Sequence, residues 1–330
     1  MLRPYLLPAL LLSLLLPQAP AADGFLLVTN KGDQTLSIID GATHRQVAAV
    51  PEEGVTGHEV CASPDGTRAF VPIFGTGGVG SPGVFGQLIR VIDIAKRQIT
   101  GTIDLGKPVR PHCPVYNEAT DRLYVTTEAE DTITIIDPKA LTVLGTVPTG
   151  APQSHMLAVS RDGKRGYTSN VNPGSVSVLD LEARKVVTVI PVSPRAQRIS
   201  LSVDDKFAFT ADQTQDRLAV IDTATNTVKQ WVDLPGIAYG TAPTPDGKHL
   251  VVALINLSEV GLIDLATMKL VKTVPVPRAP QAIVVRPDGK YAYASCDAKA
   301  QVAAIRLSDF AVETLIDVGK TADGMAWAGK

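Results

Sequence analysis

The sequence lacks several features that would point to a familiar class of protein. It has only three cysteines, Cys61, Cys113 and Cys296. This small, odd number excludes a disulfide framework, although a single Cys61–Cys113 bridge is conceivable in an oxidising compartment. The formal net charge is −2 and there is no basic tract, so no strong field would attract nucleic acid. The absence of a Gly-x-Ser-x-Gly motif argues against a serine hydrolase.

Long apolar runs are confined to the N-terminus. Arg3 precedes an apolar run from Leu6 to Leu16, and Ala19-Pro20-Ala21 then supplies the small residues of a cleavage site. The run is too short for a membrane helix and is typical of a signal peptide. We therefore predict that residues 1–21 are removed and that residues 22–330 form one domain. The mature protein is expected to be periplasmic or secreted, without membrane insertion.

A short pattern recurs along the rest of the chain. A polar residue is followed by a small apolar run and then by a turn such as Ser63-Pro64-Asp65-Gly66 or Thr244-Pro245-Asp246-Gly247. We index each copy by its polar residue, and successive indexed residues lie 54, 43 and then 42 residues apart. The indexed residues are His58, His112, His155, Gln197, Tyr239, Gln281 and Asp323. The chain is therefore a repeat protein.

Each copy carries the pattern of four β-strands. Segments such as Thr132-Ile133-Thr134-Ile135 and Ser175-Val176-Ser177-Val178 alternate polar and apolar residues, which indicates strand and not helix. Four strands in a repeat of this length are typical of a β-propeller blade. The sequence thus predicts an all-β fold, a seven-bladed β-propeller with four antiparallel strands per blade. The copy that begins at Phe25 lacks its innermost strand, and Asp323 to Trp327 supplies it, so both chain ends close the ring in one blade.

Three segments of the repeat resemble a known family. Leu27-Val28-Thr29-Asn30, Tyr124-Val125-Thr126-Thr127 and Tyr167-Thr168-Ser169-Asn170 are each followed by a strand ending in Asp. They are similar to the YVTN-type repeats of secreted bacterial and archaeal seven-bladed propellers. The resemblance covers nearly the whole mature chain and implies the fold. It leaves the function open, because such relatives include surface-layer proteins, lactonase-like enzymes and cofactor-binding propellers.

Three consecutive blades carry histidine at the indexed position, namely His58, His112 and His155. On composition alone, seven positions would hold roughly 0.1 of a histidine. Neighbouring innermost strands run close to the axis, so we expect the three imidazoles to converge on a divalent transition metal such as Zn, Cu or Fe. Two alternatives stay open. The channel mouth is simply polar and hydrated, or one histidine acts directly in acid–base chemistry.

Charged residues are predicted at the same mouth. Glu59 or Glu128 would add a carboxylate ligand or a general base, and Asp212 and Asp323 belong to other blades of the same mouth. Arginines near the indexed positions would favour a carboxylate or phosphate group. They are Arg110, Arg195, Arg198 and Arg278. For these arginines the alternative is that they are simply solvated.

One blade has a longer loop than the others. The extra residues of the first His-bearing blade fall between Phe74 and Gln87, a glycine-rich segment joining its second and third strands. That loop should rise on the histidine face, where Phe74 and Phe85 would cover an apolar ligand as a lid. The alternative is a surface insertion without a role.

Two functions of different class follow from these residues. In the first, a metal on the three histidines serves a lactonase or lyase reaction on a small anionic substrate, with Glu59 moving the proton and Arg198 or Arg110 anchoring the substrate. In the second, a non-catalytic exported propeller binds a partner protein, a metal or a cofactor. The monomer is the expected state in both.

Overall fold

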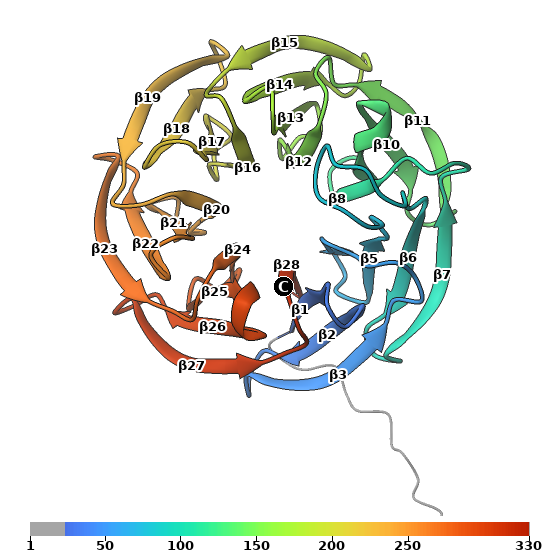
Figure 1. Cartoon of the computed structure of the whole chain (residues 1–330), viewed down its shortest axis with the longest axis horizontal. Helices are drawn as coiled ribbons and strands as arrows, with labels where there is room; N and C mark the ends of the chain where they lie inside the picture. The colour runs from blue at the N-terminus through green and yellow to red at the C-terminus, as the bar shows by residue number, and fades with distance from the viewer. Residues whose placement is uncertain (1–23, 330) are drawn as a thin grey trace, which may run out of the picture.

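The computed structural model describes residues 24–329, so the predicted signal peptide lies outside the described residues. Seven four-stranded sheets surround a central channel as the blades of a propeller (Figure 1). All pairs of neighbouring strands are antiparallel, as predicted. The only helices of the described part are two single 3₁₀ turns, Glu128–Glu130 and Asp297–Lys299, and neither is long enough to cross a bilayer.

We number the blades from the first complete one in the chain. Blade 1 consists of β4 (Cys61–Ala62), β5 (Arg68–Pro72), β6 (Leu88–Asp93) and β7 (Gln98–Asp104). Blade 2 consists of β8 (Pro111–Asn117), β9 (Arg122–Thr127), β10 (Thr132–Asp137) and β11 (Thr142–Pro148). Blade 3 consists of β12 (Ser154–Val159), β13 (Arg165–Asn170), β14 (Ser175–Asp180) and β15 (Lys185–Pro191). In each blade the first strand lies next to the channel and the fourth lies at the rim (Figure 1).

The remaining blades repeat this order. Blade 4 consists of β16 (Ala196–Leu201), β17 (Phe207–Asp212), β18 (Arg217–Asp222) and β19 (Thr227–Asp233). Blade 5 consists of β20 (Ala238–Pro243), β21 (His249–Leu254), β22 (Glu259–Asp264) and β23 (Lys269–Pro275). Blade 6 consists of β24 (Pro280–Val285), β25 (Tyr291–Cys296), β26 (Gln301–Arg306) and β27 (Ala311–Asp317). Blade 7 consists of β28 (Ala322–Ala328), β1 (Phe25–Asn30), β2 (Thr35–Asp40) and β3 (Arg45–Pro51).

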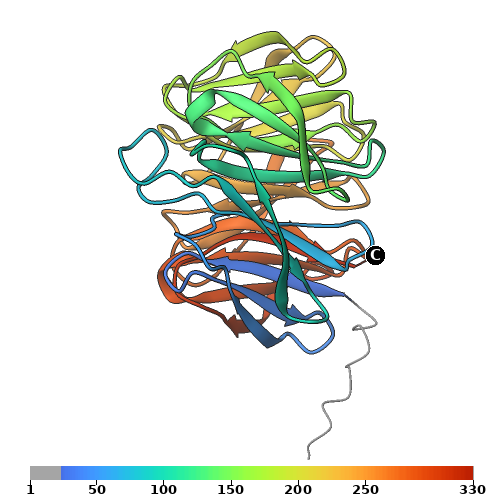
Figure 2. The same cartoon turned by 90° about the vertical axis from the view of Figure 1, so that its right-hand side faces the viewer.

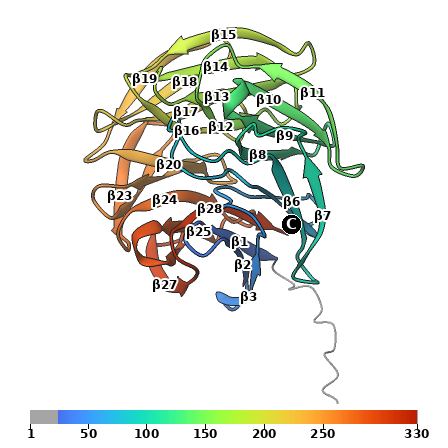
Figure 3. The same cartoon turned by 45° about the vertical axis from the view of Figure 1, so that its right-hand side comes forward.

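Both chain ends meet in blade 7, as the incomplete first repeat predicts. Strand β28 pairs antiparallel with β1, with Leu27 opposite Ala326, and the two strands lie side by side in Figure 3. The Trp327 ring stacks on Tyr293 of blade 6 at a centroid distance of 5.9 Å. This closure pairs the open edge of β1 and also packs blade 7 against its neighbour.

The core lies between the blades. The second and third strands of a blade are buried on both faces, because adjacent blades cover them from both sides. For example, Leu26 to Asn30 of β1 are all buried. The outermost strands alternate instead, as in β7, where Ile103 is buried while Asp104 is exposed. Alternation in the sequence therefore does not distinguish rim from middle strands, because the alternating segments 132–135 and 175–178 lie in β10 and β14, third strands that are almost entirely buried.

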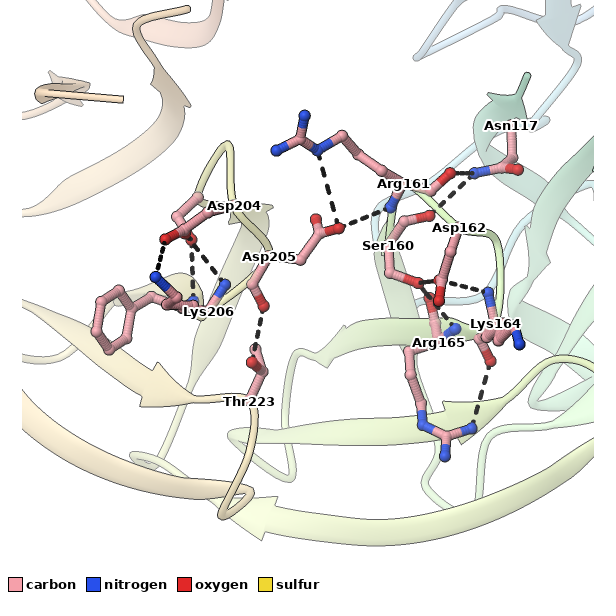
Figure 4. Close-up of polar contacts among 12 residues, drawn as sticks. Asn117, Ser160, Arg161, Asp162, Lys164, Arg165, Asp204, Asp205, Lys206 and Thr223 are labelled. Carbon is pink, nitrogen blue, oxygen red and sulfur yellow. Dashed lines mark hydrogen bonds and ion pairs between the residues drawn. The ribbon is translucent and has the colours of Figure 1, made fainter. Parts of the chain in front are cut away.

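The recurrent turn between the first and second strands is held by its own side chains. In blade 3 the Ser160 hydroxyl donates to Asp162 Oδ1 at 2.7 Å, and the Lys164 amide donates to the same oxygen at 3.0 Å (Figure 4). Gly163 takes a φ of +73°, which glycine adopts without strain. The sequence Ser-x-Asp-Gly is thus a self-contained turn.

The same face joins neighbouring blades. Asn117 of blade 2 donates to the Ser160 carbonyl at 3.0 Å, and the Arg161 amide of blade 3 donates to Asp205 of blade 4 at 2.9 Å (Figure 4). The two ends of the channel are therefore unlike. One carries these short turns, and the other carries the indexed residues and the long loop of blade 1, which projects beyond the blades in Figure 2.

Candidate site at the channel mouth

The indexed residues lie on β-bulges of the innermost strands. In blade 3, Ser154 pairs with Asn170 and Met156 with Ser169, so His155 is the extra residue. The same shift occurs in blades 2, 4, 5, 6 and 7. A bulge disrupts the alternation of side chains and re-aims them. Consequently the residue after the indexed one in blades 2 to 6 also lines a cavity of the channel, whereas period two alone would have turned it away.

Hydroxyl groups of the second strands hold these bulges. Thr29 donates to the His58 carbonyl at 2.8 Å, and Thr126 donates to the His155 carbonyl at 3.0 Å. Thr126 also accepts from the Cys113 amide at 2.8 Å. Both threonines belong to the repeat segments quoted above, so the Thr of that repeat fixes the backbone that presents the histidines. An unmade hydrogen bond at such a buried site costs about 1–3 kcal/mol.

The three predicted histidines lie together. The His58 and His112 ring centroids are 5.3 Å apart, and those of His112 and His155 are 3.8 Å apart. His112 and His155 are buried, and the Nδ1 atom of each has no hydrogen-bond partner. Phe74 covers the group, with its ring centroid 4.3 Å from that of His58 and 5.0 Å from that of His112.

All three imidazoles are neutral at physiological pH. Burial lowers the pKa of His58 to about 4, although Asp323 pulls in the opposite direction. Burial also lowers the pKa values of His112 and His155 well below the usual range, and the other imidazoles and Arg198 add to the effect. Neutral imidazole is the form that binds metals.

The ring spacing can be compared with that of a metal site. Imidazole nitrogens about 2.0–2.1 Å from one tetrahedral ion place neighbouring ring centroids roughly 5 Å apart. The His58–His112 pair has this spacing, whereas the His112–His155 pair is closer. Within residues 24–329, no three His, Cys, Asp or Glu side chains are already arranged to hold a metal ion. Binding one ion would therefore require the rings of His112 and His155 to separate by roughly 1 Å.

Beside the histidines lies a network of four charges, of which Glu59, Arg198 and Asp323 are buried and Lys31 is partly buried. Arg198 Nη2 is 2.9 Å from Glu59 Oε1 and 2.9 Å from Asp323 Oδ1. Lys31 Nζ is 3.0 Å from Asp323 Oδ2. Two cations thus face two carboxylates, and the Arg198 charge is already compensated. An anionic substrate would have to compete with Glu59 and Asp323 for this guanidinium.

The two carboxyl groups of this network differ. Burial raises the pKa of Glu59 to about 7, against the opposing pull of Arg198. Asp323 is equally buried, but Lys31 and Arg198 outweigh that burial and lower its pKa. Asp323 is therefore a permanent anion, whereas Glu59 exchanges a proton near neutral pH. A carboxyl group with this property beside a possible metal position is suited to general acid–base work.

The Arg110 side chain contacts the long loop of blade 1. Its guanidinium lies 4.5 Å from the Phe74 ring centroid and 4.4 Å from that of Phe85. It donates to the carbonyls of Ser81 at 2.9 Å and Thr76 at 2.6 Å. The side chain is 1% exposed. All of these contacts join Arg110 to the loop, a structural role that the sequence did not predict, and its role as a substrate anchor stays a prediction.

Glu128 completes this attachment. Its carboxylate accepts from the Gly80 amide at 2.8 Å and lies 3.4 Å from Arg110 Nη1. The loop rises on the histidine face, as predicted, and its Phe74 lies over the imidazoles. We predicted that Phe74 and Phe85 would both cover a ligand, but Phe85 packs on the Arg110 guanidinium.

Replacing Arg110 by Met should release the loop. The variant loses both carbonyl hydrogen bonds and leaves Glu128 buried without its cation, so we expect amide exchange of residues 76–85 to become at least about 10-fold faster. Hydrogen exchange read by mass spectrometry measures this. The matched control is Arg278→Met, because Arg278 is exposed. Equal exchange in the wild type and R110M would contradict the assignment.

The other charged residues predicted for the mouth lie apart from the histidines. Asp212 is fully buried and accepts from Arg217 Nε at 2.9 Å and from the Thr214 hydroxyl at 2.6 Å, so its own loop satisfies it. Arg195 and Arg278 are exposed. Sequence reasoning also missed Lys31, which lies in the turn after β1 and has no place in the indexed pattern.

Comparison with known proteins adds a family to this description. A family profile described as a domain of unknown function, DUF5074, matches residues 111–328, which is more than half of the chain. The chain belongs to the DUF5074 family. The YVTN-type resemblance stays a prediction beside it. A search of curated proteins found no match to this DUF5074 chain.

A solved structure supports the architecture. The DUF5074 chain is similar to a chain of hydrazine synthase from Kuenenia stuttgartiensis, with a TM-score of 0.72 and 19% identity. The match covers 90% of this chain and 99% of that one. At this identity the likeness concerns the fold alone, and function has to be argued from the channel mouth.

Proposed function

We propose that this protein is an exported propeller that binds one transition-metal ion on His58, His112 and His155. The observation that carries the proposal is the pair of buried Nδ1 atoms, on His112 and His155, which have no hydrogen-bond partner. Buried polar atoms are normally satisfied. Three neutral imidazoles, with His112 at 5.3 Å from His58 and at 3.8 Å from His155 between ring centroids, supply nitrogen donors that suit Zn, Cu or Fe.

The location supports the same function. The predicted signal peptide would carry the protein to the periplasm or the exterior, where it would meet such ions as a monomer. The two cations of the network beside the histidines are offset by Glu59 and Asp323, so the network would not repel a bound cation when Glu59 is ionised. The long loop that begins at Phe74 would restrict access to the histidines and exclude large ligands.

A second function is a metal-dependent hydrolase or lyase, for example one acting on a lactone or another small anionic substrate. The raised pKa of Glu59, about 7, favours it, because a carboxyl group poised there can take a proton at neutral pH. Arg198 would bind the substrate only after giving up one of its two carboxylates. Binding of a partner protein at this mouth remains the non-catalytic alternative.

The experiment is a metal titration of protein purified without a histidine tag. We expect one Zn²⁺ or Co²⁺ per chain by isothermal titration calorimetry, with displacement of one ion by the other. The tetrahedral d–d absorption of Co²⁺ would report the ligand geometry. A chain that binds no ion under these conditions would contradict the proposal. Turnover of a lactone panel by the loaded protein would then separate the catalytic from the binding function.

A further inference from the structure

A small cavity lies in the channel next to the network, with a volume of about 180 Å³. Glu59 and Arg198 form part of its wall, together with three sulfur-containing side chains, Cys113, Met156 and Met325. All three sulfur-containing residues are buried. The cavity is large enough for an ion and a few water molecules.

The sulfur content of this wall is unusual for this chain. The whole sequence contains four methionines and three cysteines. Twelve wall residues drawn at random would include roughly a quarter of one sulfur-containing residue, yet three are present. The remaining wall positions are mainly apolar or small, so the sulfur atoms are the soft donors of the cavity.

Two of these residues directly follow histidines of the proposed metal site. His112 precedes Cys113 in blade 2, and His155 precedes Met156 in blade 3. Both pairs lie on bulges of adjacent innermost strands. The Cys113 sulfur is 3.7 Å from the Leu157 carbonyl oxygen of blade 3, so it lies at the boundary between the two blades. Two nitrogen and two sulfur donors thus come from neighbouring blades.

One residue of the cavity wall also has an unpartnered polar atom. Arg198 is 8% exposed and its Nε atom has no hydrogen-bond partner. A buried donor of this kind normally finds a partner, so it indicates a small polar occupant, such as water that accompanies an ion.

Charge selects the kind of ion. Two cationic side chains, Lys31 and Arg198, already lie against the two acidic side chains, Glu59 and Asp323, so the network offers no surplus negative charge to a bound cation. A monovalent cation bound to the Cys113 thiolate adds no net charge, whereas a divalent ion on the same thiolate leaves one uncompensated charge in a buried site. Thiolate and thioether donors favour Cu(I) over Zn²⁺ and Fe²⁺.

We propose that this cavity is a Cu(I) site, in which Cys113 and Met156 bind the ion and the histidines that precede them, His112 and His155, pass it on together with His58. The proposal rests on the proposed function for the passage through the histidines, but the sulfur site itself can be tested separately. Binding involves no redox change. One Cu–S bond forms to Cys113, the thiol proton is released to solvent, and Met156 donates a lone pair without losing a proton.

The test is anaerobic Cu(I) titration in competition with a chromophoric Cu(I) chelator. Wild-type protein should bind one Cu(I) and release about one proton. C113S and M156L should each weaken Cu(I) binding at least about 10-fold, and C113S should abolish the proton release. The matched control is M268L, since Met268 lies in a turn of blade 5 away from the cavity. Copper X-ray absorption of the wild type should show sulfur neighbours, a result that does not depend on the folding of any variant.

The outcomes separate the two proposals. Cu(I) bound by the wild type without sulfur neighbours, or bound equally well by the double variant C113S/M156L, would overturn the Cu(I) site. Binding of Zn²⁺ or Co²⁺ but not Cu(I) would also overturn it and would leave the three-histidine site intact. A third outcome concerns the histidines. If the wild type binds Cu(I) through sulfur and the H112Q/H155Q variant takes up Cu(I) at the same rate, the histidines are not part of the route by which the ion enters. That result would retain the cavity site.

Discussion

Arg198→Met should lower the free energy of unfolding by about 3–5 kcal/mol, the usual cost of breaking a buried ion pair by removing one partner. The reason is local, because Glu59 and Asp323 would then be buried side by side without the guanidinium that separates them. Lys31 reaches only Asp323. Urea denaturation followed by circular dichroism measures the change.

Two comparisons decide whether the network is responsible. Arg195→Met is the matched control, since Arg195 is exposed three residues away, and it should change stability by less than about 0.5 kcal/mol. The double variant E59Q/R198M should recover part of the loss, with a coupling energy of about 1–3 kcal/mol. If E59Q does not reduce the loss of stability in R198M, that loss comes from side-chain packing and not from charge.

The variant H112Q/H155Q should bind Zn²⁺ at least about 100-fold more weakly than the wild type. Loss of even an outer partner of a metal ligand typically costs 10–100-fold in affinity, so loss of two ligands should cost at least this much. Glutamine keeps a polar side chain of similar size in the bulge. The control is H249Q, because His249 lies in β21 and outside the mouth. Equal affinity of H112Q/H155Q and the wild type would show that the ion binds elsewhere.

The pH dependence follows from the lowered imidazole pKa values. Protons compete with a metal only below the pKa of its ligands, and the pKa of His58 is about 4. Zinc affinity should therefore stay nearly constant from pH 8 to about 6 and fall only below about pH 5. An exposed histidine cluster would already lose metal near pH 6.5, the ordinary pKa. Titrations at several pH values distinguish the two cases.

The same shifts affect the stability of the metal-free protein. As pH falls from 7 to 5, the unfolded chain takes up protons on these histidines while the folded chain does not, so their burial destabilises the fold increasingly. Glu59 acts in the opposite direction, because its raised pKa lets the folded state bind a proton first. H112Q/H155Q should thus lose less stability over this range than the wild type. A larger loss in the variant would contradict the burial of neutral imidazoles.

Spacing in the sequence was sufficient to predict the ring. The 42-residue interval is one blade, and the missing first strand before Phe25 predicted the shared blade that β28 completes. The Cys61–Cys113 bridge that seemed conceivable is not formed, since both residues are free thiols. Spacing predicts topology because a strand and its turn are local structures.

The site was predictable only in part, for two physical reasons. Strict alternation turns Cys113 and Met156 away from the channel, and the bulge that re-aims them is a tertiary feature held by threonines such as Thr126. Arg110 has the charge of an anion receptor, but its position between Phe74 and Phe85 depends on how the loop folds back. The indexed positions in the sequence predict which residues face the channel axis, but they do not predict which charged side chains form ion pairs.

The most direct measurement is anomalous diffraction from crystals of the untagged mature protein grown with Zn²⁺. The account predicts one strong peak at the channel mouth, about 2.0–2.1 Å from a ring nitrogen of each of His58, His112 and His155. The centroids of the His112 and His155 rings should also be more than 3.8 Å apart. No peak there at saturating Zn²⁺, with the two ring centroids still 3.8 Å apart, would contradict it.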